Sequence, residues 1–144
     1  MVELRKEMKE LNYLYREIDR IYHEISMKVG LSDSAFMILY AIAELGDGCL
    51  QKDIADIYLF SRQTINSSIQ KLQEKGILQL TKGKRRDMHI SITEKGKEML
   101  EEKIYPVMEA ENSVFDELSK PESTEYLQLM RKTTSLLWDK VKEL

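Results

Sequence analysis

The sequence predicts a mainly α-helical chain that carries one small β-hairpin. Two observations support this prediction. Apolar residues recur at intervals of three and four over most of the 144 residues, which is the period of amphipathic helices. Only between Leu78 and Ile92 does the pattern change to alternation, which is the period of strands. A chain of this length suits one domain, or two small ones that share a core.

Residues 4–29 form the first predicted helix. Its apolar residues recur at alternating intervals of four and three: Leu4, Met8, Leu11, Tyr15, Ile18, Tyr22, Ile25 and Val29. A heptad seam of this length is typical of a helix that packs along a partner helix. Gly30 then suits the position that ends the helix. We expect this helix to pack against a second copy of the chain; the alternative is that it covers its own domain's core.

Two helices follow. Ser32 is a suitable N-cap for the first, which is apolar over much of its circumference and is therefore expected to be central. It ends at Gly46 and Gly48. A short helix over residues 50–59 comes next. Three of its residues are expected to face inward: Leu50, Ile54 and Ile57.

The next helix, from Ser61 to Gly76, has two contrasting faces. Ser61 occupies the N-cap position, and Ile65, Ile69 and Leu72 share one face. The opposite face carries short polar side chains and almost no acid: Arg62, Gln63, Asn66, Ser67 and Gln70. Two short helices joined by a tight turn form a helix-turn-helix pattern. The polar face alone could be an ordinary solvated surface, so its neighbours decide the interpretation.

A basic hairpin follows this helix. Leu78 and Leu80 alternate with polar residues, as do Met88, Ile90 and Ile92, and the loop between the two runs is "KGKRRD". Between residues 61 and 86, seven basic residues stand against one acid, a net charge of +6, whereas the whole chain carries −3. A basic patch on an acidic body is typical of a nucleic-acid interface. A helix-turn-helix followed by such a hairpin is a winged helix-turn-helix.

The residue types on this surface suit double-stranded DNA. Arg pairs with guanine, Asn and Gln pair with adenine, and Ser and Thr bond phosphates or bases. The recognition-helix residues expected to contact DNA are Ser61, Arg62, Gln63, Thr64, Asn66, Ser67, Gln70 and Lys71. The wing residues expected to contact the backbone or the minor groove are Lys82, Lys84, Arg85 and Arg86.

Long helices complete the chain. Thr93 is expected to cap a helix that Pro106 kinks or splits. Ser119 and Glu122 fit a capping box for the last helix, which runs to the C-terminus.

The span from Leu31 to Gly96 resembles the MarR family of bacterial transcriptional regulators. The similar stretches are "LSDSAFMILYAIAEL", "LQKDIADIYLFSRQTINSSIQKLQEKGIL" and "KRRDMHISITEKG". In the family the wing ends in Asp-x-Arg, a short strand and Leu-Thr-x-x-Gly. Here Ile92 replaces the leucine, Arg86 falls on the wing arginine, and Lys84 stands where the aspartate is usual. Asp87 is a candidate substitute for that carboxylate.

The resemblance implies a homodimer whose first and last helices intertwine, with one winged helix in each subunit. It implies binding to a pseudo-palindromic operator, usually as a repressor, and release by a small aromatic or lipophilic ligand. Residues 1–30 and 100–144 would then form the helical dimerisation region, and residues 31–99 the DNA-binding domain. The expected dimer seam consists of Leu4, Met8, Leu11, Tyr15, Ile18, Leu136 and Leu137.

Other classes of function find little support. The apolar runs are too short for a membrane span, the N-terminus is charged, and a cytoplasmic location is expected. We expect no enzyme, cofactor or metal site, because phosphate-loop, nucleophile and ligand-cluster motifs are absent from the sequence. Cys49 could be a redox switch, but no base neighbours it and a peroxide-sensing branch of the family carries its cysteine in the first helix. Two rival interpretations stay open: a winged-helix module that binds protein, and a nonspecific architectural DNA binder.

Overall fold

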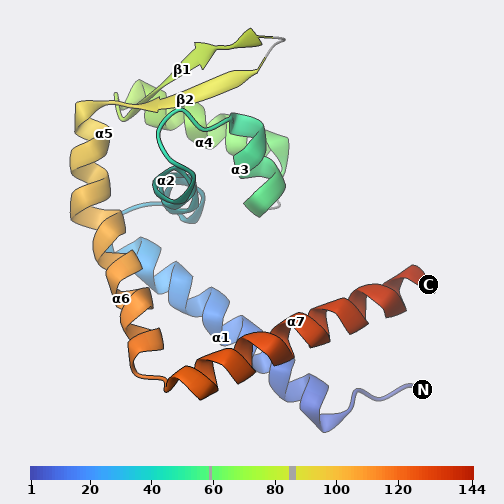
Figure 1. Ribbon diagram of the computed structural model, residues 1–144. Helices are drawn as coiled ribbons and strands as arrows, with labels where there is room; N and C mark the ends of the chain where they lie inside the picture. Colours follow the sequence, from blue (N-terminus) through green and yellow to red (C-terminus); the bar gives the residue numbers. More distant parts are fainter. Residues whose placement is uncertain (59, 85–86) are drawn as a thin grey trace. The chain divides into compact units, whose positions relative to one another are not determined.

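A computed structural model of the chain describes residues 1–58, 60–84 and 87–144. Figure 1 shows the order of its elements. They are α1 (Lys6–Lys28), α2 (Asp33–Leu45), α3 (Gln51–Tyr58), α4 (Arg62–Glu74), β1 (Leu78–Lys82), β2 (Met88–Ile92), α5 (Glu94–Met99), the π-helical turn η2 (Leu100–Ile104), α6 (Tyr105–Asp116) and α7 (Lys120–Lys142). The predicted fold class, a mainly α-helical winged helix-turn-helix, is confirmed.

The chain divides into two compact units, residues 1–107 and 108–144. The first unit holds α1, the winged helix-turn-helix and the start of α6, and the second holds the rest of α6 and α7. The boundaries predicted from the sequence separate a dimerisation region from a DNA-binding domain. They describe function and not compactness, so they stay predictions.

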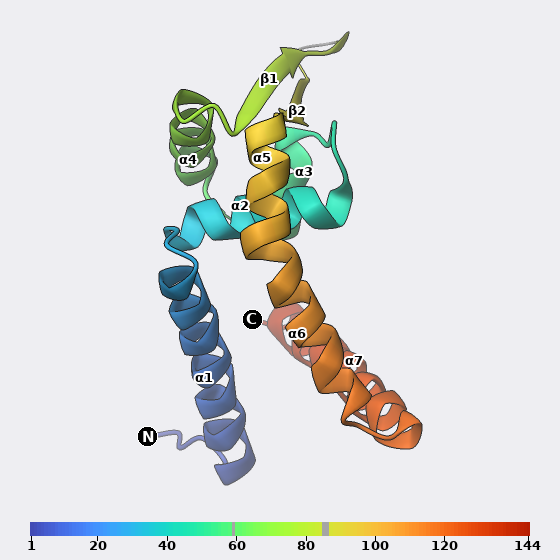
Figure 2. The same cartoon turned by 90° about the vertical axis from the view of Figure 1, so that its left-hand side faces the viewer.

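Helix α2 is the centre of the first unit. It contacts α1, α3, α4 and η2, and Figure 2 shows it running across the unit behind α5. Phe36, Ile38 and Leu39 are fully buried, as the apolar circumference of this helix predicted. The hydroxyl of Ser32 accepts the backbone N–H of Ala35 at 3.2 Å, which confirms the predicted N-cap.

Helix α1 ends as predicted but begins later. Gly30 has φ +71°, and the N–H groups of Gly30 and Leu31 donate to the carbonyls of Met27 and Ser26, which is a Schellman ending. Leu4, the first residue of the predicted seam, precedes the helix. The ammonium of Lys103 in η2 donates to the Val29 carbonyl at 2.8 Å, so a cation meets the negative end of α1.

The hairpin has the predicted alternation. β1 and β2 pair antiparallel with Leu78 opposite Ile92 and Leu80 opposite Ile90. Leu78 and Ile90 are buried, which fixes the register because a slip by one residue would expose both.

Two predicted side-chain directions are wrong. Ile57 was expected to face inward, but 53% of its surface is exposed, because α3 is short and Ile54 is the one residue of α3 that is fully buried. His89 lies between Met88 and Ile90 in the alternating pattern, which predicts that it faces outward, but it is half-buried. Its Nδ1 lies 2.9 Å from the Gly48 carbonyl oxygen, because the segment before α3 passes along the free edge of β2.

The helical path from α5 to α6 continues through Pro106, but the turn before the proline is not a regular α-helical turn. A proline lacks the N–H that an α-helix needs, and its ring collides with the carbonyl four residues earlier. Just before Pro106 the chain forms η2, in which the Tyr105 N–H donates to the Leu100 carbonyl, five residues back. This wider turn is a known way for a helix to accommodate a disruption.

The second unit contains the predicted last helix. The Ser119 N–H donates to the Glu122 carboxylate at 2.8 Å, and the Glu122 N–H donates to the Ser119 hydroxyl at 3.3 Å. The capping box is therefore confirmed. Hydrogen bonds from the backbone and side chain of Ser119 to the Glu122 carboxylate lower the pKa of Glu122. Of the described helices, none alone is long and apolar enough to cross a membrane; α1 and α2 pass that test only as a pair, with a bend of 92° between them.

Candidate nucleic-acid interface

Helix α4 begins at a well-formed cap. The Ser61 hydroxyl accepts the backbone N–H of Thr64 at 3.1 Å, and the two hydroxyls lie 2.8 Å apart. The first turn contains no acid and instead carries Arg62. A positive side chain at the positive end of a helix lowers the stability of the helix by about 0.3–1 kcal/mol unless an anion is nearby. This arrangement therefore suits contact with a phosphate or a base edge.

The inner face of α4 determines which side chains reach solvent. Ile65, Ile69 and Leu72 are at most 2% exposed. Ser68 is also buried, and its hydroxyl donates to the Ser34 hydroxyl of α2 at 2.8 Å. Small residues here let the two helices pack closely. The opposite face is left to solvent, and the predicted contact residues on it are exposed: Arg62, Gln63, Asn66, Ser67, Gln70 and Lys71.

Two of the predicted contact residues are already engaged within the helix. The Ser67 hydroxyl donates to the Thr64 carbonyl at 3.0 Å, and the Gln70 amide donates to the Glu74 carboxylate at 3.2 Å. Thr64 is half-buried beside Ser61. For Arg62, Gln63 and Lys71, the described part of the chain offers no hydrogen bond or ion pair to the side chain. Their donors are therefore available to an external partner.

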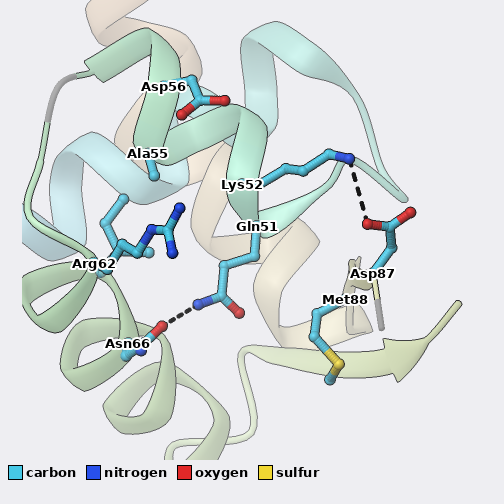
Figure 3. A pocket seen from close by; sticks show the side chains of 9 residues that line it. Gln51, Lys52, Ala55, Asp56, Arg62, Asn66, Asp87 and Met88 are labelled. Carbon is cyan, nitrogen blue, oxygen red and sulfur yellow. Dashed lines mark hydrogen bonds and ion pairs between the residues drawn. The ribbon is translucent and has the colours of Figure 1, made fainter. Parts of the chain in front are cut away.

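An open groove lies between α3, the start of α4 and the start of β2 (Figure 3). Its volume is about 480 Å³. The Gln51 amide donates a hydrogen bond to Oδ1 of Asn66, and the Lys52 ammonium pairs with the Asp87 carboxylate at 3.3 Å. Arg62 directs its guanidinium into the same groove in Figure 3. Two predicted contact residues, Arg62 and Asn66, thus meet here with residues of α3.

The sequence prediction missed Gln51 and Lys52. Both lie in the first turn of α3, fifteen or more residues before their partners, so no local periodicity marks them. The only available signal was the helix-turn-helix itself, which brings the start of its first helix towards the second.

The described part of the wing carries two of the predicted cations. Lys82 and Lys84 are exposed, whereas Arg85 and Arg86 lie outside the described residues. Asp87, the candidate support for Arg86, is paired with Lys52 of α3. The Gly83 N–H donates to the Asp87 carbonyl at 2.7 Å and closes the base of the loop.

The wing is fixed to the rest of the winged helix by His89 and by backbone hydrogen bonds between β2 and the segment before α3. A Cβ placed on Gly83 would lie 2.7 Å from the imidazole of His89, so a larger residue at this position would have to displace the His89 ring. The Gly48 N–H donates to the Ile90 carbonyl, and the Ile90 N–H donates to the Cys49 carbonyl, at 2.8 and 2.9 Å. The segment before α3 therefore lies along the free edge of β2, where Leu50 forms an isolated bridge to His89.

The predicted dimer residues differ in exposure within the single chain. Met8 and Leu11 are half-buried. The others are 41% to 56% exposed: Leu4, Tyr15, Ile18, Leu136 and Leu137. Further large apolar side chains are exposed on the same helices, namely Leu14 and Ile21 of α1 and Trp138 and Val141 of α7. Each of the two helices therefore presents apolar surface to solvent.

Cys49 is a half-buried thiol. Burial raises its pKa, and the carboxylates of Asp53 and Asp47 raise it further. The thiol is therefore neutral near pH 7, where a reactive cysteine would be a thiolate. Among the described residues, no three His, Cys, Asp or Glu side chains are grouped so as to hold a metal ion.

Comparison with known proteins shows which proteins this arrangement is similar to. Residues 29–87 match the MarR family. No curated protein matches the chain. Among solved structures, a MarR family regulator from Neisseria meningitidis matches with a TM-score of 0.82 and 20% identity, over 96% of this chain and 99% of that one.

Two further solved structures are similar. The S. aureus MepR–DNA complex matches with a TM-score of 0.70 and 19% identity, over 94% of this chain and 99% of the other. Bordetella bronchiseptica BpsR, whose DNA binding is regulated by 6-hydroxynicotinic acid, matches with a TM-score of 0.65 and 21% identity, over 87% of this chain and 98% of the other. The resemblance to MarR-family winged helix-turn-helix regulators is therefore confirmed, by sequence over residues 29–87 and by fold over nearly the whole chain.

Proposed function

We propose, from the MarR-family match of residues 29–87, that this chain is a homodimeric transcriptional regulator that binds a pseudo-palindromic operator in double-stranded DNA. In this proposal α4 enters the major groove, and the wing lies along the adjacent backbone or minor groove. The chain acts as a repressor and is released by a small aromatic or lipophilic ligand.

The outer face of α4 is the observation that carries the proposal. It combines Arg62 in the first turn with exposed amide and hydroxyl side chains, and Glu74 is its only acid. Amides and a guanidinium can distinguish base edges, whereas a surface built only for charge would carry lysine throughout. Lys82 and Lys84 on the wing add contacts suited to phosphates, which fix the position of the helix on the duplex.

The exposed apolar surfaces of α1 and α7 support the dimer. Large apolar side chains that stand in solvent in the single chain are typical of a surface that another chain covers. A two-fold dimer places its recognition helices roughly 34 Å apart, one turn of B-DNA, when both bind neighbouring half-sites. A ligand that changes this separation would weaken binding.

Two solved structures with the same fold support DNA and a small ligand as partners. MepR was solved in complex with DNA, and the DNA binding of BpsR is regulated by 6-hydroxynicotinic acid. These are properties of proteins with the same fold. We extend them to this chain as a proposal, and we assign no residue to the ligand.

Fluorescence anisotropy tests the proposal. The purified protein is titrated onto a duplex from upstream of its coding sequence and onto a scrambled duplex of equal length, over a salt series. Tighter binding to the first duplex, with affinity that falls as salt rises, is the expected result.

The rival functions give different results in the same titration. Equal, salt-sensitive binding to both duplexes would favour a nonspecific architectural protein. No binding to either duplex, even at low salt, would favour a winged helix that binds protein.

A further inference from the structure

Asn66 is held by a residue of another helix. The Gln51 amide of α3 donates a hydrogen bond to Oδ1 of Asn66, in the middle of the outer face of α4 (Figure 3). Among the amide side chains of α4 in the described part of the chain, Asn66 alone is bonded to a different element. Gln70 is bonded to Glu74 of its own helix, and Gln63 is exposed.

The residues on both sides of Gln51 are held in place. The preceding residue, Leu50, forms a bridge to His89 of β2, and the following residue, Lys52, pairs with Asp87. The side chain of Gln51 is half-buried in the groove whose walls include Ala55 and Met88. The start of α3 is therefore attached to the wing on one side, and through Gln51 to α4 on the other.

This attachment changes what Asn66 can present to a base. An asparagine amide has a donor end and an acceptor end, and a free side chain can turn either end towards a base. Here the donor of Gln51 makes Oδ1 the end that faces α3. The Nδ2 group is then directed elsewhere, with its two hydrogens available. The hydrogen bond therefore couples the orientation of the Asn66 amide to that of the Gln51 side chain.

We infer that Gln51 is a positioning residue for base recognition, and that it fixes the donor–acceptor orientation of Asn66 and so the base that Asn66 prefers. This inference rests on the proposed function, because it concerns the same DNA-binding surface. The specificity of one operator position then depends on two helices, although only α4 enters the groove.

Two substitutions of Gln51 separate this role from simple packing. Gln51→Ala removes the hydrogen bond and lets the Asn66 amide rotate. Gln51→Glu keeps the size of the side chain but can only accept at neutral pH, so Asn66 must turn its Nδ2 group towards α3. The first change should broaden the base preference at the position that Asn66 reads, and the second should change the preferred base.

The experiment measures base preference position by position. The probe is the duplex that the wild-type protein enriches from a randomised pool, made with each of the four bases at every position. Affinities are measured for the wild type, Asn66→Ala, Gln51→Ala, Gln51→Glu and the Gln51→Ala/Asn66→Ala double variant. Gln73→Ala is the matched control, because Gln73 is an exposed amide of the same helix that is not among the expected contact residues. Circular dichroism melts confirm that each variant is folded.

The expected result is that Asn66→Ala and Gln51→Ala lose discrimination at the same operator position, by about fivefold or more. The double variant should match Asn66→Ala there, because the two residues act as one unit. Gln73→Ala should leave that position unchanged.

Two results would overturn the inference. In one, Gln51→Ala and Gln51→Glu keep the wild-type preference at the position that Asn66→Ala affects. In the other, Asn66→Ala changes no position. Failure of the proposed function is distinguishable from both, because the wild-type protein would then enrich no sequence from the pool.

Discussion

Gly96 of α5 lies directly against the carbonyl oxygen of Ile77: a Cβ added to Gly96 would be 2.1 Å from that oxygen. Thr93 strengthens this junction, since its hydroxyl accepts the Gly96 N–H at 3.1 Å and lies 2.9 Å from the same carbonyl. The Ile-Thr-x-x-Gly motif therefore joins the start of α5 to the segment between α4 and β1.

Gly96→Ala should destabilise the fold. The added methyl group must push apart two backbone segments, and overpacking of this kind costs about 1–3 kcal/mol. Urea unfolding measures the change in the free energy of unfolding. Glu98→Ala, at an exposed position of the same helix, is the control and should change stability by no more than about 0.5 kcal/mol. Equal stability of the two variants would show that the junction opens without cost.

Arg62→Ala and Lys82→Ala should weaken DNA binding in different ways. Removing Arg62 should cost about 1–3 kcal/mol and relax the preference for sequence, because a guanidinium reads guanine. Removing Lys82 should weaken binding to all duplexes alike and reduce the salt slope by about 1, because one phosphate is no longer neutralised. Anisotropy titrations on matched and scrambled duplexes separate the two. Normal operator binding by Arg62→Ala would remove α4 from the role of recognition helix.

Ile18→Lys should dissociate the proposed dimer. Ile18 is an apolar residue of α1 that is 45% exposed in the single chain, and covering a charge there would be costly. Sedimentation velocity measures the oligomeric state. Arg20→Glu is the control, because residues two apart point to opposite sides of a helix. A variant Ile18→Lys that sediments as a stable dimer would exclude this face from the interface.

Cys49 should react slowly with iodoacetamide at pH 7. Burial and the nearby carboxylates raise its pKa, so the thiolate that reacts is scarce. Because the folded-state pKa is above the ordinary value, the rate should keep rising with pH beyond the range in which a free cysteine levels off. Folding favours the neutral thiol, so this group's contribution to stability is present below the ordinary pKa and is lost as the pH rises through the raised one. A pH–rate profile that matches a free cysteine would contradict the burial argument.

The helices could be predicted from the sequence because their boundaries are local. The hydroxyls of Ser32, Ser61, Thr93 and Ser119 each accept an N–H three residues ahead, and each cap was identifiable from residue type and spacing. The exposed polar face of α4 follows equally from the helical period of its sequence. Because Ile65 and Leu72 are buried on one side of the helix, the residues on the opposite side are left in solvent.

The remaining features depend on contacts between distant segments. The alternation of the strand predicts that His89 faces outward. In the structure the segment that includes Gly48 covers that edge of β2, and the imidazole of His89 lies in hydrogen-bonding distance of the Gly48 carbonyl oxygen. The bond between Gln51 and Asn66 joins two helices, so it is invisible to any local pattern. The accommodation of Pro106 by a π-helical turn, where a kink or a break was equally consistent with its ring, also required the structure.

Selection from a randomised pool of duplexes tests the central claim most directly. The purified wild-type protein is mixed with the pool, and the bound duplexes are recovered and sequenced over several rounds. We predict enrichment of a pseudo-palindrome whose half-sites lie about 10 base pairs apart, centre to centre. Recovery of duplexes with no shared sequence would contradict the claim that α4 reads bases, and would leave only charge to explain any binding.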